Sequence, residues 1–407
     1  FFTSKARTLE TLPGLHPGIV ASATYWDAHI SQAERLCIEL LADAAAANQG
    51  CRAINYVRPE AAEEGAVALH DEVGGERVRV EPQIVVNAAG AWVDKANAAL
   101  GIESRFMGGT KGSHLIVDCP DLHRALDGGM VYYQHSDGRV CIVFPVGDKL
   151  LMGSTDLRVD DPDEARCEED EVEYMLTTLR GIFPGIDIRR DQIVYVFCGV
   201  RPLPASEGGP TATITRGHFI ETLEPEGDRP WPVLCLIGGK WTTFRALAEL
   251  AADRVLERLG RQRRRSTEAE PIGGGKGYPQ DDAAKQRWVE RVAEASGLDR
   301  QRVCTLLERY GTVAEAYAAD ADAEAETPLG TLPDHTVGEI RRIVEDEHVV
   351  HLDDLLIRRT TLALLGRATP EAIDELAGLL ADALGWDEAR RSDEARRARE
   401  AVAVPGR

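Results

Sequence analysis

Glycines next to a basic residue, placed where an apolar strand ends, are the clearest candidates for binding a negatively charged ligand. Gly238-Gly-Lys-Trp-Thr-Thr-Phe-Arg245 follows the apolar run 234–237, where a strand is predicted to turn into a helix. Backbone N–H groups at such a helix start attract negative charge, and the glycines let a flat ligand approach the backbone. The alternative is that Thr242 or Thr243 only caps the helix.

A second basic residue lies at the end of another apolar run. Gly199-Val-Arg-Pro-Leu203 places Arg201 directly after the expected strand 194–198. A guanidinium fixed at this point can bind a phosphate through two parallel hydrogen bonds. For an isolated arginine at a strand end, a structural ion pair is the alternative.

Other sequence motifs give weaker signals. The chain has no G-x-G-x-x-G, and Gly239-Lys240 is followed by Trp241 rather than by the Ser or Thr of a P-loop. His348 and His351 have the spacing of a helical metal pair, which would suit a zinc hydrolase, but no third ligand is evident. The eight cysteines lack zinc or iron–sulfur spacing, so we predict reduced cysteines and no metal site.

The 407-residue chain has the composition of an ordinary globular protein, and its helices and strands must position these residues. The 68 acidic and 47 basic residues give a net charge of −21, which argues against a nucleic-acid partner. No apolar run reaches the length of about 18 residues that a membrane helix needs, and the start has no signal-peptide pattern. A cytoplasmic location is therefore expected.

The periodicity of apolar residues predicts a mixed α/β body followed by helices. We predict a helix over 32–48, a strand near 52–57, a hairpin turning at Gly74-Gly75, and a strand over 84–90 followed by a short helix. Residues 111–200 are typical of an antiparallel sheet with one helix over 168–180. Strand 234–239 precedes a helix over 244–259. A body to about residue 260 and an all-helical domain from about 271 are expected.

An ordered set of motifs resembles a known family. The body contributes Asn87-Ala-Ala-Gly-Ala-Trp-Val93, Lys111-Gly-Ser-His114, Gly153-Ser-Thr-Asp156 and the two segments at Arg201 and Lys240. The helical region contributes Arg309-Tyr-Gly311, Asp354-Leu-Leu-Ile-Arg-Arg-Thr360 and Leu384-Gly-Trp386. Together, from about Tyr25 to Glu394, they resemble the FAD-dependent glycerol-3-phosphate dehydrogenases, within the larger family of amine and hydroxy-acid flavoprotein oxidases.

The resemblance implies a division of the chain. Residues 31–100 and 234–260 would form pieces of a Rossmann-like FAD/NAD(P)-binding domain, interleaved with an antiparallel substrate-binding sheet over about 105–233. Residues 271–400 would form the helical C-terminal domain of the family. Residues 1–260 together would be the oxidoreductase body.

The resemblance also implies a reaction, the oxidation of sn-glycerol 3-phosphate to dihydroxyacetone phosphate with FAD as cofactor. Electrons would pass to a quinone, with peripheral contact at the inner face of the cell membrane, and a homodimer is a further expectation. Oxygen as the acceptor is an alternative.

The resemblance implies roles for particular residues. His114 would be the catalytic base, Arg201 would bind the substrate phosphate, Arg216 is the second choice for that contact, and Lys240 would lie by substrate and flavin. The implied FAD contacts are Asn87, Ala88, Gly90, Gly238, Gly239, Lys240, Trp241 and Thr242.

The sequence departs from the family pattern at its start. Family members begin with a β-α-β unit whose glycine-rich loop holds the FAD pyrophosphate, followed by an Arg-Tyr pair near the substrate. Neither is present here, so we expect an N-terminally truncated member. A catalytically inactive fragment, unable to bind FAD alone, is the alternative from a different class of function.

Overall fold

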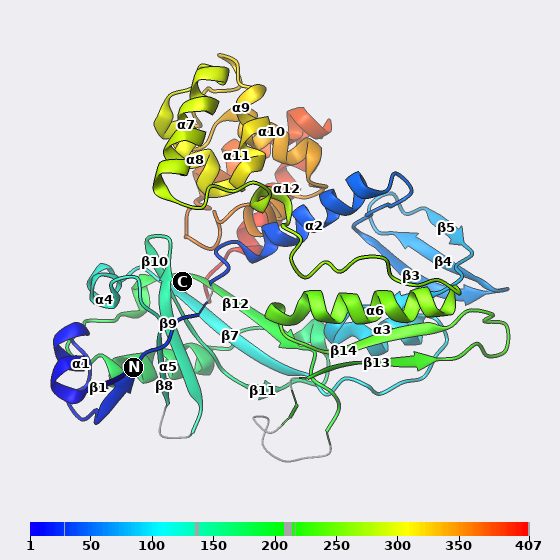
Figure 1. Ribbon diagram of the computed structural model, residues 1–407, viewed down its shortest axis with the longest axis horizontal. Helices are drawn as coiled ribbons and strands as arrows, with labels where there is room; N and C mark the ends of the chain where they lie inside the picture. Colours follow the sequence, from blue (N-terminus) through cyan, green and yellow to red (C-terminus); the bar gives the residue numbers. More distant parts are fainter. Residues whose placement is uncertain (28, 135–137, 207–213, 216, 406–407) are drawn as a thin grey trace.

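A mixed α/β body and a helical part lie against each other in the computed structural model, which describes residues 1–27, 29–134, 138–206, 214–215 and 217–405 (Figure 1). The predicted fold class is confirmed. Within the described ranges, no helix has both the length and the apolar character that spanning a membrane requires.

An antiparallel sheet forms the centre of the body. Its strands pair in the order β11-β7-β10-β9-β8, and β12 also pairs with β7. Their bounds are β7 Thr110–Val117, β8 Val131–Gln134, β9 Val140–Val146, β10 Lys149–Gly153, β11 Leu157–Arg158 and β12 Ile193–Arg201. The predicted helix in this region is α5, Glu169–Ile182, and a further short helix, α4, spans Pro120–Leu126.

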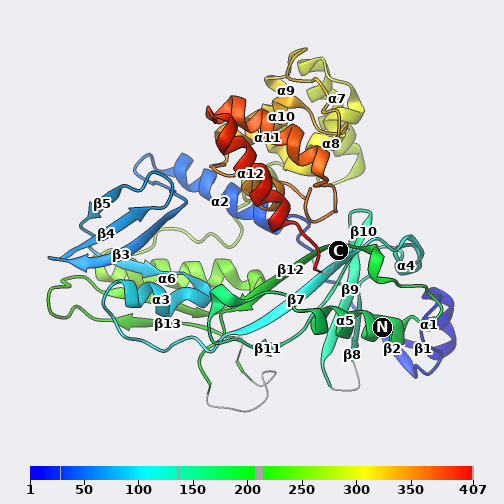
Figure 2. The same ribbon diagram turned by 180° about the vertical axis from the view of Figure 1, so that it is seen from behind.

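Alternation along β7 gives this sheet two different faces. Leu115 and Val117 pack with Met175 and Leu179 of α5, which lies behind the sheet in Figure 1 and is seen from the other side in Figure 2. Ile116, which points the opposite way, joins the core of the helical part. The helical part therefore packs on the face of β7 and β12 opposite α5.

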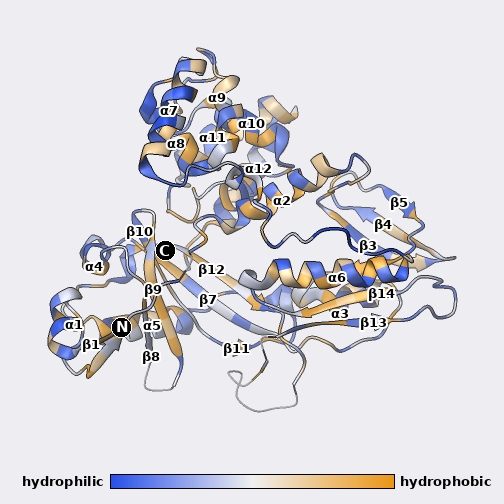
Figure 3. Cartoon of the chain, viewed as in Figure 1, coloured by the Kyte–Doolittle hydropathy of each residue, from blue (hydrophilic) through white to orange (hydrophobic). Residues whose placement is uncertain are grey.

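A second sheet, with three strands among the residues that the structure describes, lies beside the first. Its order is β13 (His218–Leu223), β14 (Val233–Gly238) and β6 (Val85–Asn87), with β14 antiparallel to β13 and parallel to β6. Helix α3 (Val93–Ala99) packs its Val93 on β14. Helix α6 (Phe244–Arg258), along which apolar and polar residues alternate in Figure 3, contacts β13 and β14.

Two expectations differ from the observed strands. The strand expected near 52–57 begins only at Val57, as β3, and the residues before it are irregular. Strand β13 lies within the range 105–233 expected for the antiparallel sheet, but it pairs with β14. The pairing of β13 depends on a strand further along the chain, which local periodicity does not reveal.

The remaining body elements flank these sheets. The predicted helix over 32–48 is α2, Ala33–Ala47, and the hairpin at Gly74-Gly75 joins β4 (Ala66–Asp71) to β5 (Arg77–Val80) in a sheet with β3 (Val57–Glu63). At the start of the chain, β1 (Phe2–Ser4) and β2 (Ala21–Ala23) pair around α1 (Lys5–Thr11).

The helical part contains six α-helices within the described residues. They are α7 Asp282–Ser296, α8 Arg300–Tyr310, α9 Ala314–Ala319, α10 Val337–Asp346, α11 Pro370–Leu384 and α12 Glu388–Ala401, with a π-helical turn at Asp354–Arg359. Buried Arg35 of α2 donates to both carboxylate oxygens of Glu347, at 3.0 and 2.6 Å, and lies over the ring of Tyr310. This contact fixes the helical part against the body.

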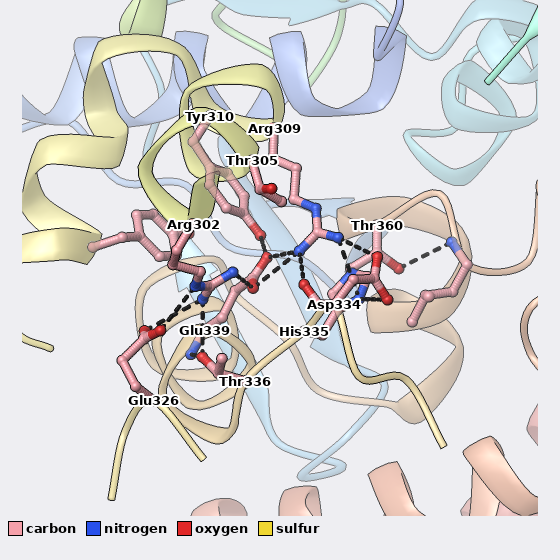
Figure 4. A network of polar contacts seen from close by, with 12 residues as sticks. Arg302, Thr305, Arg309, Tyr310, Glu326, Asp334, His335, Thr336, Glu339 and Thr360 are labelled. Carbon is pink, nitrogen blue, oxygen red and sulfur yellow. Dashed lines mark hydrogen bonds and ion pairs between the residues drawn. The ribbon is translucent and has the colours of Figure 1, made fainter. Parts of the chain in front are cut away.

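A buried carboxylate ties the helices of this part together (Figure 4). The side chain of Glu339 in α10 is fully buried and accepts hydrogen bonds from Arg302 at 3.0 Å, Arg309 at 2.8 Å and the Tyr310 hydroxyl at 2.6 Å. Arg302 also pairs with Glu326 and Arg309 with Asp334, so Glu339 is the buried carboxylate that these two guanidinium groups of α8 share.

Replacing Glu339 by alanine is expected to lower the free energy of unfolding by about 3–5 kcal/mol, because Arg302 and Arg309 would lose their buried counter-charge. Urea unfolding measures the change. Glu345 lies on the same helix but is exposed, so Glu345→Ala is the matched control and should change stability by less than about 0.5 kcal/mol. A Glu339→Ala protein as stable as this control would contradict the structural role.

Candidate active site

Strands β7 and β12 place His114 and Arg201 on one face of the antiparallel sheet. Phe197 lies opposite His114 in the register, and Arg201 lies opposite Thr110. Because side chains alternate along a strand, His114, Phe197 and Arg201 share the face that looks away from α5. The imidazole of His114 stacks on the Phe197 ring with centroids 4.9 Å apart.

Arg201 is held by the loop that follows β10. Its Nη1 donates to Asp156 Oδ1 at 3.0 Å, and its Nη2 donates to Ser154 Oγ at 3.0 Å and to the Thr155 carbonyl at 3.1 Å. The side chain is still 24% exposed. The two interpretations of Arg201 are therefore compatible, because the ion pair with Asp156 fixes a guanidinium that stays accessible to a ligand.

Two glycines make room for these side chains. A Cβ atom on Gly112 would overlap the Arg201 guanidinium, and a Cβ on Gly153 would overlap the His114 ring. The sequence did not predict a site role for Gly112, Ser154, Asp156 or Phe197. Gly112 and Gly153 lie within motifs quoted from the sequence, but their role depends on the strand register, which the sequence does not state.

His114 is electrically neutral at ordinary pH. Burial first, and the nearby positive charge of Arg201 second, lower the pKa of His114 to about 4. Its buried Nδ1 has no hydrogen-bond partner among the residues that the structure describes. A neutral imidazole with an unfilled hydrogen-bonding position is suited to accept a proton from a bound hydroxyl group.

The lowered pKa of His114 predicts a pH-dependent stability. In the unfolded chain the ring binds a proton near pH 6.5, whereas the folded protein keeps it neutral down to about pH 4. The part of the unfolding free energy that depends on the neutral ring is therefore fully present above pH 6.5. It is lost as the pH falls toward 4, by on the order of 3 kcal/mol. Urea unfolding from pH 7 to pH 4 should show the wild type losing that much more stability than His114→Gln. Equal losses in the two proteins would contradict the buried neutral state.

The predicted cofactor contacts gather at the carboxyl ends of the parallel strands β6 and β14. Cys235 lies opposite Asn87 in the register, so 87–90 and 238–242 leave the sheet at the same edge. Gly90, Gly238 and Gly239 have φ values of 58°, 75° and 99°, which favour glycine. Ligands of open α/β sheets bind at such an edge.

The side chains at this edge differ in what they can offer. The Asn87 amide donates to the Val93 carbonyl at 2.9 Å and to Asn97 Oδ1 at 2.7 Å, so it shapes the turn rather than facing a ligand. Trp241 and Thr242 are exposed, as is Ala88. The Lys240 ammonium forms no ion pair with any described residue.

The carboxyl edge of β6 and β14 meets the antiparallel sheet at the 3₁₀ turn Gly90–Trp92, which contacts both β12 and β14. The Trp92 indole donates to Asp163 at 2.6 Å and Lys95 pairs with Asp161 at 2.5 Å, which joins α3 to the segment after β11. The edge at 87–90 and 238–242 thus offers glycines with positive φ, the exposed Trp241 ring, and Lys240 just before α6. These groups suit a flat ring on which negative charge is favoured, so the residues present fit the flavin end of FAD.

The other residues to consider are Arg216, Arg358 and His351. Arg216 lies outside the described residues. Arg358 lines a cavity of about 430 Å³ together with Tyr195, Phe197 and Thr361, and it forms no ion pair with described residues. His351 donates from Nδ1 to Glu394 Oε1 at 2.7 Å, and the described residues contain no group of three side chains that could hold a metal ion.

The carboxyl edge of a parallel strand pair, set against an antiparallel sheet that carries the polar site, is the arrangement of a flavin-dependent oxidoreductase. Family models agree: residues 2–254 match "FAD dependent oxidoreductase" and residues 265–391 match "C-terminal domain of alpha-glycerophosphate oxidase". The chain belongs to the FAD-dependent glycerol-3-phosphate dehydrogenase family, whose cofactor is FAD.

Individual relatives have similar names. A glycerol-3-phosphate dehydrogenase of Synechocystis is 29% identical over 91% of this chain and 68% of its own length, and one from Mycobacterium leprae is 29% identical over 79% and 53%. A D-erythritol 1-phosphate dehydrogenase of Brucella abortus is 30% identical over 70% of this chain and 56% of its own length. The chain thus spans about two thirds of the cyanobacterial relative and about half of the others.

A solved structure has the same fold. The glycerol-3-phosphate dehydrogenase from Bacillus halodurans complexed with FAD superimposes with a TM-score of 0.83, covering 99% of this chain and 79% of that protein at 24% identity.

Proposed function

We propose that the protein oxidises glycerol 3-phosphate to dihydroxyacetone phosphate with FAD. The observation that carries the proposal is the placement of neutral His114 and the fixed, partly exposed Arg201 on one sheet face, next to the edge formed by 87–90 and 238–242. FAD, when bound, supplies the acceptor for the hydride that leaves carbon 2.

The residues of the chain would bind and orient the substrate. Arg201 would bind the phosphate, since its guanidinium is already fixed by Asp156 and loses little freedom on binding. The partnerless nitrogen of His114 would accept the hydroxyl proton. Lys240 and the backbone before α6 would hold the flavin and favour negative charge on it. Arg216 is a second proposed phosphate contact.

D-Erythritol 1-phosphate is the second candidate substrate, because a relative of comparable identity has that activity in its name. Both compounds are polyol phosphates, so Arg201 would serve either. The rate at which each compound reduces protein-bound FAD under anaerobic conditions separates them, with unphosphorylated glycerol as the control. The proposal expects fast reduction by glycerol 3-phosphate and little by glycerol. Faster reduction by D-erythritol 1-phosphate would overturn the choice of substrate.

For the second half of the reaction we propose a quinone as electron acceptor, with the protein acting as a homodimer at the inner face of the cell membrane. Oxygen is the alternative acceptor. Consumption of a soluble ubiquinone analogue and of oxygen, measured with the same reduced protein, distinguishes the two. Quinone reduction that outpaces oxygen consumption supports the proposal, and the reverse order contradicts it.

A further inference from the structure

A buried carboxylate lies beneath the site, on the opposite face of the antiparallel sheet. Glu171 is in the first turn of α5 and is 3% exposed. Its Oε1 accepts from Ser113 Oγ at 2.9 Å and from Thr155 Oγ1 at 2.6 Å, and its Oε2 accepts from Lys111 Nζ at 2.6 Å and the Glu168 amide at 2.9 Å. Four donors therefore hold both oxygen atoms.

The charge state of Glu171 follows from these contacts. Burial by itself would raise the pKa of Glu171, but the hydrogen bonds from the Glu168 amide, Lys111, Thr155 and Ser113 outweigh burial and hold that pKa below its ordinary value. Glu171 is thus a carboxylate at neutral pH. Lys111, 9% exposed, is its counter-charge.

Thr155 links this carboxylate to Arg201. Its side chain is 1% exposed, and its Oγ1 donates to Glu171 and accepts from the Ser113 amide at 2.9 Å. Its backbone carbonyl accepts from Arg201 Nη2 at 3.1 Å. The residues on either side, Ser154 and Asp156, also accept hydrogen bonds from that guanidinium.

From this connection we infer that Glu171 and Thr155 are positioning residues for Arg201. Capping α5 needs only the bond from the Glu168 amide to Glu171. The bonds from Ser113 and Thr155 serve a different purpose, because they fix strand β7 and the 154–156 loop relative to each other. Without the Thr155 hydroxyl, the loop that orients the guanidinium loses its anchor in the protein interior. The identity of the anion that Arg201 binds rests on the proposed function.

The test uses Thr155→Val, which removes the anchoring hydroxyl, and Thr155→Ser, which keeps it. Thr178→Val is the matched control, because Thr178 is equally buried and hydrogen-bonded, but to Met175 and away from the site. Calorimetry measures glycerol 3-phosphate binding to the FAD-loaded protein. NMR titration measures the pKa of His114, which the charge of Arg201 helps to lower.

We expect Thr155→Val to weaken glycerol 3-phosphate binding about tenfold or more, since small misplacements of binding groups are costly. We also expect it to raise the pKa of His114 by roughly half a unit, because the Arg201 charge moves away from the ring. Thr155→Ser should restore both values to within about twofold in affinity, and Thr178→Val should leave both unchanged.

The possible failures are distinguishable. Unchanged binding and an unchanged His114 pKa in folded Thr155→Val would overturn the positioning role. If Arg201→Gln binds glycerol 3-phosphate as well as the wild type does, the proposed function fails, whereas a His114 pKa that still rises in Thr155→Val would support the positioning role. If Thr155→Val does not fold, Ser113→Ala takes its place with the same readouts, and an unchanged His114 pKa in that variant would also overturn the role.

Discussion

Replacing Arg201 by glutamine is expected to weaken glycerol 3-phosphate binding about 100-fold while the protein keeps its FAD. When a fixed guanidinium is removed from a partly desolvated site, phosphate binding loses about 2–5 kcal/mol of free energy. This loss corresponds to an increase in Kd of about 30-fold to several thousand-fold. The substrate KM should rise and kcat should fall. FAD retention should not change, because the glycine edge at 238–242 belongs to the other sheet.

The control for this variant is Arg105→Gln, which removes the same charge from an exposed arginine that the structure shows without a hydrogen bond or ion pair to a described residue. Arg201→Lys should give an intermediate loss, because an ammonium keeps the charge without the two-pronged geometry. Loss of the flavin spectrum in Arg201→Gln would refute the assignment, since it would place Arg201 in cofactor binding or in folding.

Replacing His114 by glutamine is expected to slow flavin reduction by substrate about 100-fold to 10,000-fold, the usual contribution of a positioned base. In the free protein burial, and after it the charge of Arg201, lower the pKa of His114 to about 4. A bound phosphate would neutralise that charge, so substrate should raise the pKa of His114 and make it a better proton acceptor.

The pH dependence separates this role from a structural one. In the wild type, the decline of kcat/KM that His114 causes should come only near pH 4, because kcat/KM reports the free protein, whereas the substrate phosphate titrates at about pH 6 in every variant. His114→Gln should lose that decline together with the rate. A variant with an unchanged rate of flavin reduction would show that His114 only packs against Phe197.

Local patterns in the sequence predicted the elements well. The amphipathic run that became α5 and the apolar runs that became β6 and β14 carry their own periodicity, so their types follow from neighbouring residues. What local patterns could not provide is pairing between distant strands. The parallel partnership of β6 with β14 depends on contacts between residues more than 100 positions apart, and β13 joins that sheet through its pairing with the nearby β14.

The same distinction applies to the site. His114 and Arg201 were proposed from motifs, and the register of β7 with β12 places both on one face. Gly112 and Glu171 have no signal of their own in the sequence. Gly112 matters because of the side chain that crosses it, and Glu171 resembles any acidic residue at a helix start until the sheet is folded over it.

The most direct test of the account is the visible absorbance spectrum of the protein with bound FAD, before and after glycerol 3-phosphate is added without oxygen. Dithionite added last shows how much of the flavin can be reduced. We predict that glycerol 3-phosphate bleaches the bound flavin and that dithionite adds little further change. A protein that retains no FAD, or whose bound FAD is bleached by dithionite but not by glycerol 3-phosphate, would contradict the proposed function.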